Sequence, residues 1–459
     1  MATRLADLVG RFAGELICPG DQAYETARRV WNGAIDRRPA VIARCRDAAD
    51  VVTALRFGRA RGLPVAVRGG GHGVAGTAVC DDGLVIDCGP MKGIEVDGPA
   101  RTARAGAGVL WGELDARTQA LGLATTGGIV SHTGIAGLTL GGGIGWLMRR
   151  HGLTCDNLLA VDLVTADGEQ RRVDAEHEPD LFWALRGAGS NFGVATAFEY
   201  RLHPVGPSVL AGAVYYDLAD GVEVLRAYRD LASGAPAELT TIVNLRRAPP
   251  APFLPAALHG RPVVALLACW CGPPDEGERV LRPFRRLARP LLDLVRSRPY
   301  VEHQAMLDAV VPHGWHYYWK SVDLPPLSDQ VIAAVVEHSR RITSPLSYTV
   351  IFHLGGAVAR VPEAATAYAH RAAAHAVNIN AVWRPDDGEA TRHIAWAQAF
   401  VDALAPAQIG AYVNFLGDEG QDRVRAAYGP GTYARLAALK RRWDPDNVFR
   451  SNQNIPPAP

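Results

Sequence analysis

Two glycine-rich stretches decide the fold of this chain: Arg68-Gly69-Gly70-Gly71-His72-Gly73, directly after a strand-like run, and Thr126-Gly127-Gly128-Ile129-Val130-Ser131-His132-Thr133-Gly134, which continues through Gly137 to Gly141-Gly142-Gly143-Ile144-Gly145. Glycine lets a backbone approach a ligand closely, but it costs chain entropy on folding. So many glycines together are expected only where their N–H groups bind something. Because successive amides form a concavity that binds anions without a lysine, both stretches predict a cradle for a polyphosphate.

These stretches do not match the common nucleotide motifs. Neither holds a GxGxxG that opens a helix and is followed by a distant acidic residue, so the NAD-type fingerprint is poorly met. The chain also lacks the GxxxxGK[ST] of a P-loop NTPase. The alternative is that both stretches are turns of a glycine-rich fold. Two long clusters, one of them tipped by His72, favour a ligand site over that alternative.

The overall composition is that of a globular protein. Of 459 residues, 48% are hydrophobic and 21% are charged, and a formal net charge of +1 gives no attraction to nucleic acid or to an anionic membrane surface. No apolar stretch is long enough to cross a bilayer. The seven scattered cysteines contain no CxxC pair, which favours a reducing, cytoplasmic compartment. The fourteen histidines show no HExxH or paired spacing, so we expect no metal site.

The N-terminus does not have the continuous apolar core of a signal peptide. Its apolar positions instead predict a short amphipathic helix through Leu5, Leu8, Val9, Phe12 and Leu16.

Length and composition predict three segments. Residues 1–203 alternate short β-branched runs with glycine clusters and helices, including a helix at 48–62 that leads into a strand at 65–67. Residues 204–417 form a second domain. Residues 418–459 read as helix, turn, helix and extended end, and they are too short to bury a core of their own. This last segment must pack onto another domain.

The second domain combines long strand-like segments with helices. The strand-like segments are 262–270, 347–361 and 379–384, and the helical ones include 329–342 and 366–377. This mixture favours an α+β domain with one broad sheet.

Four ordered motifs point to a family. RGGGH at 68–72 and the segments 141–168 and 180–204 resemble the vanillyl-alcohol-oxidase (PCMH) type of FAD-binding domain. The tail at 433–457 resembles the closing segment of the berberine-bridge-enzyme branch of that family, and the middle of the chain matches loosely. The resemblance implies an α+β fold: a PCMH-type domain of two α+β subdomains, and a substrate domain with a broad antiparallel sheet and flanking helices.

The resemblance also implies the cofactor and its site. FAD would lie between the two subdomains, its pyrophosphate in the glycine stretches, with His72 joined covalently to a methyl on the flavin's benzenoid ring. Such a bond anchors the cofactor and raises its redox potential. The other FAD-binding positions that it implies are Arg68, Gly69, Gly70, Gly71, Gly73, Thr126, Gly127, Gly128, Ser131, His132, Gly134, Gly137, Gly142, Gly143, Gly145, Val194, Asn452 and Asn454. For His132, a histidine that only bonds the backbone is an equally good interpretation.

The chain departs from the family pattern at two positions. Val130 occupies the place where many members carry a second flavin link through cysteine, and Cys155 is too far along to substitute. We therefore expect a single link, as in the bacterial hydroxynicotine-oxidase-like members that this segment resembles. Phe415 takes the place of a tyrosine that serves as part of the base in alcohol- and sugar-oxidising members, and phenylalanine has no ionisable group.

The resemblance implies catalytic positions at Thr133, which would control oxygen approach, and at Tyr412 and Asn414. In a strand, Tyr412 and Asn414 would share one face and Phe415 the other. An aromatic run at 315–319 suggests that Tyr318 or Lys320 reaches the substrate, and His353 is a further candidate, although packing is the more common role for each.

The sequence therefore predicts oxidation of a small organic molecule at a carbon next to nitrogen or oxygen, with molecular oxygen as the acceptor. An amine is favoured, since its own lone pair can drive hydride departure without a protein base. A flavin-dependent oxygenase or oxidative cyclase of secondary metabolism, a dehydrogenase with another acceptor, and a non-catalytic flavin-binding protein stay open.

Overall fold

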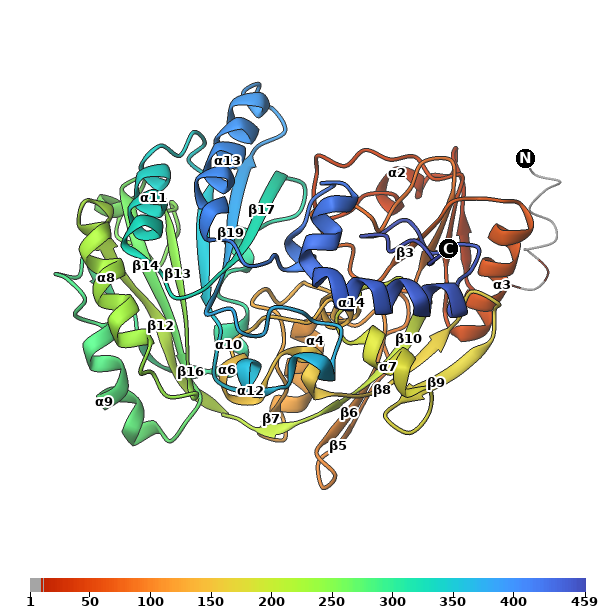
Figure 1. Ribbon diagram of the computed structural model, residues 1–459, viewed down its shortest axis with the longest axis horizontal. Helices are drawn as coiled ribbons and strands as arrows, with labels where there is room; N and C mark the ends of the chain where they lie inside the picture. Colours follow the sequence, from red (N-terminus) through yellow and green to blue (C-terminus); the bar gives the residue numbers. More distant parts are fainter. Residues whose placement is uncertain (1–9, 11) are drawn as a thin grey trace.

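A computed structural model describes Gly10 and residues 12–459 of the chain. Figure 1 shows two halves side by side: several small sheets with the C-terminal helix α14 on one side, and one broad sheet on the other. Of the expected N-terminal helix, Leu5, Leu8 and Val9 lie outside the described residues. Leu16 belongs to a strand, so the helix prediction is wrong at that end.

The first small sheet supports the first glycine stretch. Its order is β1-β2-β4-β3, with β2 and β3 parallel to β4 and β1 antiparallel to β2. The strands are β1 (Glu15–Ile17), β2 (Val41–Arg44), β3 (Val65–Arg68) and β4 (Leu84–Asp87). Helix α3 (Ala48–Ala60) connects β2 to β3, as the sequence predicted, and it is capped by the Asp47 carboxylate. Strand β3 ends at the first residue of the glycine stretch and so fixes where that stretch begins.

The second small sheet is antiparallel, in the order β5-β6-β10-β8-β9. Its strands are β5 (Ile94–Asp97), β6 (Thr102–Gly106), β8 (Leu158–Val164), β9 (Gln170–Asp174) and β10 (Val194–Arg201). Helices α4 (Trp111–Gln119), α5 (Ile135–Leu140) and α7 (Pro179–Leu185) belong to the same part of the chain. Both small sheets contribute to one hydrophobic core, which confirms the pair of α+β subdomains.

The other half is built on an eight-stranded sheet in which every strand pair is antiparallel. Its strands are β12 (Ser208–Asp217), β13 (Leu239–Arg247), β14 (Pro262–Trp270), β15 (Leu292–Asp293), β16 (Arg296–Pro299), β17 (His316–Leu324), β18 (Tyr348–His353) and β19 (His375–Trp383). Helices α8 (Gly221–Ala232), α9 (Pro274–Phe284), α11 (Asp329–Arg340) and α13 (Ala390–Leu404) cover its outer face (Figure 1). The broad antiparallel sheet with flanking helices is confirmed.

Alternation along the strands separates the two faces of this sheet. Residues such as Val243, Ile351 and Ile379 pack with the helices in one core. Their neighbours Ile242, Val350 and others belong to a second core, which is shared with the half of the molecule that holds the small sheets. The sheet therefore presents its inner face to the glycine stretches.

Two predictions for the second domain are wrong. Residues 366–374 contain no helix; they form a loop in which Tyr368 N–H donates to the Arg186 carbonyl and the Arg371 guanidinium pairs with Asp156. These tertiary bonds, together with a positive φ of 60° at His370, override the helical spacing. The strand predicted at 347–361 ends earlier, at His353, the last residue of β18. Helix α12 (Ala357–Arg360) follows after a pair of glycines.

The C-terminal segment packs against the half of the molecule that holds the small sheets. Helix α14 (Gln421–Trp443) has a kink at Gly429, whose φ is 71°, followed by Pro430. The Lys440 ammonium is fully buried, donates to the carbonyls of Asn191 and Phe449, and pairs with Asp444 at 2.7 Å. The shorter elements are α2 (Tyr24–Ala27), β7 (Leu123–Ala124), α6 (Met148–His151), β11 (His203–Pro204) and α10 (Tyr300–Gln304).

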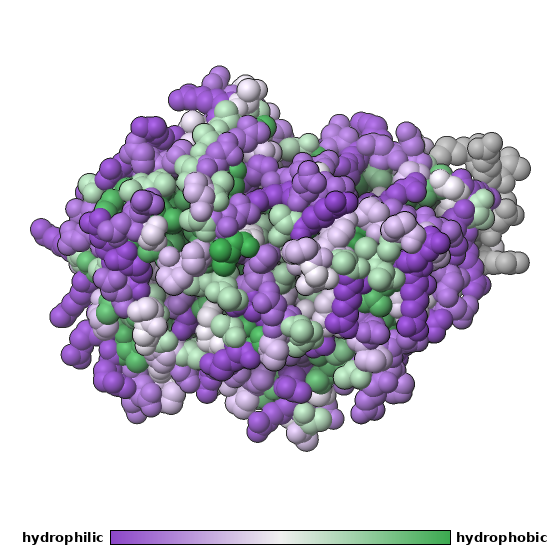
Figure 2. Space-filling view, viewed as in Figure 1, coloured by the Kyte–Doolittle hydropathy of each residue, from purple (hydrophilic) through white to green (hydrophobic). Residues whose placement is uncertain are grey.

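The outside of the molecule is mostly hydrophilic on the face that Figure 2 shows, with apolar residues scattered among polar ones. Within the described part of the chain, no helix is both long and apolar enough to cross a membrane.

Candidate functional site

The two glycine stretches touch each other. A Cβ atom added to Gly70 would lie 2.5 Å from the Gly134 nitrogen and 2.6 Å from its Cα, and a Cβ on Gly134 would lie 2.7 Å from the Gly70 Cα. Since real Cβ atoms do not approach backbone this closely, the contact requires glycine on both sides. Both residues line one pocket between the two halves of the molecule.

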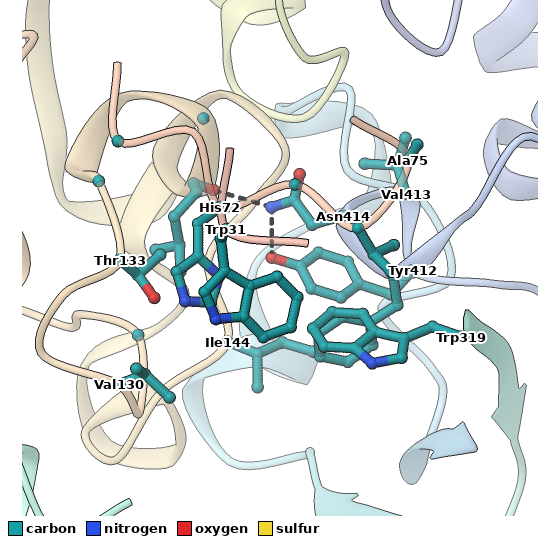
Figure 3. Close-up of a pocket in the computed structure, with 18 of the residues that line it drawn as sticks. Trp31, His72, Ala75, Val130, Thr133, Ile144, Trp319, Tyr412, Val413 and Asn414 are labelled. Carbon is teal, nitrogen blue, oxygen red and sulfur yellow. Dashed lines mark hydrogen bonds between the residues drawn. The ribbon is translucent and has the colours of Figure 1, made fainter. Parts of the chain in front are cut away.

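His72 lies at the tip of the first stretch, in a half-buried position in this pocket (Figure 3). The Trp31 indole stacks on its imidazole, with ring centroids 4.3 Å apart and an interplanar angle of 15°. The His72 Nε2 atom is shielded from solvent and has no hydrogen-bond partner among the described residues. Burial, and then His132 and His313, lower the pKa of His72 to about 3. The imidazole is therefore neutral at physiological pH.

Thr133 and Val130 follow on the second stretch, and both line the pocket (Figure 3). Val130 is where a second flavin link would need a cysteine. Cys155 is fully buried and does not line the pocket, and burial raises the pKa of its thiol well above the ordinary value. The pocket therefore contains His72 as a possible flavin-linking residue, but position 130 carries no thiol for a second link.

Tyr412 and Asn414 reach the pocket from the segment before α14. The Asn414 side-chain amide donates to the Tyr412 hydroxyl at 2.8 Å and to the Leu138 carbonyl at 3.1 Å (Figure 3). The Gly143 N–H donates to the Tyr412 hydroxyl as well, at 2.9 Å. Burial raises the pKa of Tyr412. The hydroxyl therefore keeps its proton near neutral pH.

The strand expected at this segment is absent. Residues Val413–Phe415 form a 3₁₀ turn, which brings the Phe415 ring against the Tyr412 ring, with centroids 4.7 Å apart in an edge arrangement. Phe415 lines the pocket beside Tyr412. The prediction that the two rings point apart was wrong because it assumed strand alternation.

The tail also contributes to the pocket. Asn452 lines it, and its side-chain amide donates to the carbonyls of Ser190 and Phe449 while its Oδ1 atom stays buried without a partner among the described residues. Asn454 does not line the pocket. Its neighbour Gln453 does, and Ser190 completes this end. The sequence indicated that the tail contributes to the site, but it did not indicate Gln453 or Ser190.

The predicted cofactor residues divide into two groups. Those that line the pocket are Gly69, Gly70, Gly71, His72, Gly73, Gly128, Gly134, Gly137 and Asn452, joined by Thr133, Tyr412 and Asn414. Those that do not are Arg68, Thr126, Gly127, Ser131, His132, Gly142, Gly143, Gly145, Val194 and Asn454.

Most of the second group have a packing role instead. The Arg68 guanidinium pairs with Asp87 at 2.8 Å, and the Ser131 N–H and hydroxyl donate to the Asp308 carboxylate. A Cβ on Gly127 would meet the Trp111 ring, and one on Gly143 would meet Thr154. The glycines of the second group therefore admit neighbouring side chains, as at Gly127, Gly142 and Gly143, or neighbouring backbone, as at Gly145.

The three substrate candidates do not line the pocket, contrary to expectation. On β17 the inward residue is Trp319, so Tyr318 and Lys320 project to the other face, where Lys320 pairs with Glu419 at 2.6 Å. His353 is held by the Arg149 guanidinium, and burial lowers its pKa to about 2. The wall of the pocket that the broad sheet forms instead holds Ile242, Asn244, Arg246, Leu267, Trp319, Tyr348, Val350, Phe352, Asn378 and Asn380.

These residues fit a flavin dinucleotide. Two backbone loops that only glycine can build would accept a diphosphate, and the tail closes one end beside Ser190 and Asn452. The buried His72 Nε2 has no hydrogen-bond partner among the described residues, which fits a residue whose ring bonds a group in the pocket. His72 would hold the benzenoid edge of the flavin and the glycine stretches its diphosphate.

Comparison with known proteins agrees with this geometry. A family model described as "FAD binding domain" matches residues 39–174, and one described as "Berberine and berberine like" matches residues 411–456. An FAD-linked oxidoreductase from Dictyostelium discoideum is 33% identical over 443 residues, which cover 95% of this chain and 93% of the relative.

A second relative, (R)-6-hydroxynicotine oxidase from Paenarthrobacter nicotinovorans, is 31% identical over 465 residues, which cover 100% of this chain and 99% of the relative. The solved structure of 6-hydroxy-D-nicotine oxidase from Arthrobacter nicotinovorans is similar with a TM-score of 0.88 at 30% identity. The similarity covers 97% of this chain and 98% of that structure.

Proposed function

Because the chain belongs to the berberine-bridge-enzyme-like family of FAD-linked oxidoreductases, we propose that it is an oxidase that carries FAD on His72 and oxidises a small organic amine. When bound, the flavin would supply the redox chemistry for a two-electron oxidation of the substrate, with molecular oxygen as the final acceptor. The observation that carries the proposal is the neutral, shielded His72 at the point where the two glycine stretches meet.

His72 is suited to act as a nucleophile toward the cofactor. Its pKa of about 3 leaves a lone pair free near neutral pH, and stacking on Trp31 fixes the plane of the ring. The link is single in this proposal, since Val130 cannot form a second one.

The amine follows from the absence of a protein base. Among the described pocket residues there is no aspartate or glutamate, Phe415 cannot ionise, and the hydroxyl of Tyr412 keeps its proton because burial raises its pKa. An alcohol must lose its hydroxyl proton to a base, whereas a neutral amine supplies its own electron pair. The relative named as a hydroxynicotine oxidase also bears the name of an amine substrate.

Thr133 and Val130 would set the approach of oxygen. Both are half-buried side chains that line the pocket with His72, so in this proposal oxygen reaches the flavin from their side. We also propose a cytoplasmic location, since all seven cysteines are free thiols.

The test is a substrate screen on the purified, flavin-loaded protein. Matched pairs of amines and alcohols are added without oxygen, and loss of flavin absorbance is followed; air is then admitted and peroxide is measured. The proposal expects bleaching by amines in preference to alcohols and about one peroxide per turnover. Bleaching without peroxide would identify a dehydrogenase. Incorporation of oxygen into the product, or closure of a ring in it, would identify an oxygenase or a cyclase. If no compound bleaches the flavin, the protein binds flavin without catalysis.

A further inference from the structure

The substrate side of the pocket contains a buried cation without a counter-ion. Arg246 lies near the end of β13, lines the pocket and is only 8% exposed. Its guanidinium makes one hydrogen bond within the described structure, from Nε to the Arg247 carbonyl at 3.2 Å, and its Cζ lies 5.1 Å from the Tyr348 ring centroid. Nothing in these contacts neutralises the charge.

The titratable groups that face Arg246 are neutral. They are Tyr348 on β18 and Tyr215 on β12, and burial raises the pKa of each phenol. No carboxylate lies within ion-pair distance of Arg246 in residues 12–459. Because a buried charge is costly unless it is paired and hydrogen-bonded, the arrangement is complete only when an anion enters the pocket.

Strand register places further unpaired polar groups beside this cation. In the strand register, Tyr348 lies opposite Arg246 on one side and opposite Asn380 on the other. Two residues further along the strands, Val350 lies between Asn244 and Asn378. The side-chain oxygens of Asn244 and Asn378 are buried without a hydrogen-bond partner among the described residues. All of these residues share the inner face of the sheet because they are two positions apart on their strands.

The rest of this wall is apolar. Ile242, Leu267, Val350, Phe352 and Trp319 line the pocket around the polar group. The wall therefore suits a ligand with an apolar or aromatic body and one localised anionic group.

We propose that Arg246 binds a carboxylate of the substrate, so that the substrate is an apolar amine that also carries one carboxylate. This rests on the proposed function, and it identifies Arg246 as a specificity-determining residue for that site. The guanidinium fork matches a planar carboxylate in a bidentate geometry, with Asn244 and Asn378 available for neighbouring polar atoms.

Benzoate and benzamide provide a probe that needs no turnover. They share an aromatic ring and nearly the same shape and differ in charge. Each is titrated into the flavin-loaded protein at pH 7.5, and binding is measured by calorimetry and by the change in the visible flavin spectrum. We expect benzoate to bind about 10- to 100-fold more tightly than benzamide, the range of a charge-assisted hydrogen-bonded pair.

Two variants test whether Arg246 is the cause. Arg246→Met should bring benzoate affinity down to that of benzamide, whereas Arg246→Lys should retain part of the preference. Arg247→Met is the matched control, because Arg247 is the next residue on β13, projects to the other face and bonds the Gly260 carbonyl at 3.3 Å. It should leave the preference unchanged.

Equal affinity of the wild-type protein for the two probes, or a benzoate preference that survives in Arg246→Met, would overturn the proposal. If Arg246→Met does not fold, the comparison of wild type with Arg246→Lys decides. A benzoate preference that is weaker in Arg246→Lys than in wild type would support the proposal, and an equal preference in the two proteins would contradict it. A benzoate preference in a protein that oxidises no amine would refute the proposed function while leaving the carboxylate site standing.

Discussion

Gly70 and Gly134, 64 positions apart in the sequence, occupy a contact so close that a single methyl group on either would overlap the backbone of the other. Gly70 belongs to the loop that carries His72, and Gly134 follows Thr133 and directly precedes helix α5. The contact therefore sets the position of the proposed flavin-linking residue relative to the second glycine stretch.

The first prediction concerns this contact. Gly70→Ala should push the two loops apart, with an overpacking cost of about 1–3 kcal/mol and a lower content of bound flavin per protein. Urea unfolding and the ratio of visible to ultraviolet absorbance measure both effects. Gly93→Ala is the control, since nothing lies within 4 Å of its added methyl. Full flavin content in Gly70→Ala would show that the contact does not shape the site.

The second prediction concerns Lys440, which ties the tail to the carbonyl of Asn191. Lys440→Met leaves the Asp444 carboxylate buried without its cation, which costs about 3–5 kcal/mol. We expect a large drop in the urea midpoint and easier loss of the tail to proteolysis. The neighbouring Arg441→Met should change little, because Arg441 is exposed. A midpoint for Lys440→Met that matches the control would argue against this role.

The third prediction concerns the buried carboxyl group of Asp115. Burial raises the pKa of Asp115 to about 7, although the hydrogen bond that Gln304 donates to it at 2.8 Å acts in the opposite direction. Between pH 4 and pH 7 the folded protein holds a proton that the unfolded chain releases, so this group makes stability fall as pH rises, by at most about 4 kcal/mol. Asp115→Asn keeps the acceptor and removes the titration. The variant should gain stability relative to wild type as pH is raised from 4 to 8; parallel curves in urea unfolding would contradict the assignment.

The fourth prediction concerns Tyr412. Tyr412→Phe removes the acceptor for the Gly143 N–H and the Asn414 amide, and should cost about 1–3 kcal/mol of stability. Since burial raises the pKa of this phenol, it keeps its proton, and the pH profile of anaerobic flavin reduction by an amine should have the same shape in the variant. Loss, in Tyr412→Phe, of a rise in rate with increasing pH that the wild type shows would identify Tyr412 as the base.

The sequence was sufficient for features that depend on local chemistry. The glycine stretches indicated a close backbone approach because glycine is the residue that permits it, and the structure places Gly70 against Gly134. The kink of α14 could be predicted from Gly429 and Pro430, which break a helix in any context.

Features set by tertiary partners could not be predicted in the same way. The segment 366–374 has helical spacing, but the bonds of Tyr368 to Arg186 and of Arg371 to Asp156 hold it as a loop. Strand register decides which residue of the run 317–320 faces the pocket. The sequence suggested Tyr318 or Lys320, but the residue that lines the pocket is Trp319, which lies between them. Trp31 gave no signal, since only the fold brings it onto His72.

The covalent link at His72 is the claim on which the proposed function most depends. The direct measurement is acid denaturation of the purified protein, followed by a test for flavin in the precipitate and by peptide mapping of the flavin-bearing fragment. We expect yellow, fluorescent flavin to remain with the wild-type polypeptide on the peptide that contains His72, to be released from His72→Ala, and to remain in the surface variant His177→Ala. Free FAD in the supernatant of the wild-type protein, or flavin mapped to another residue, would contradict it.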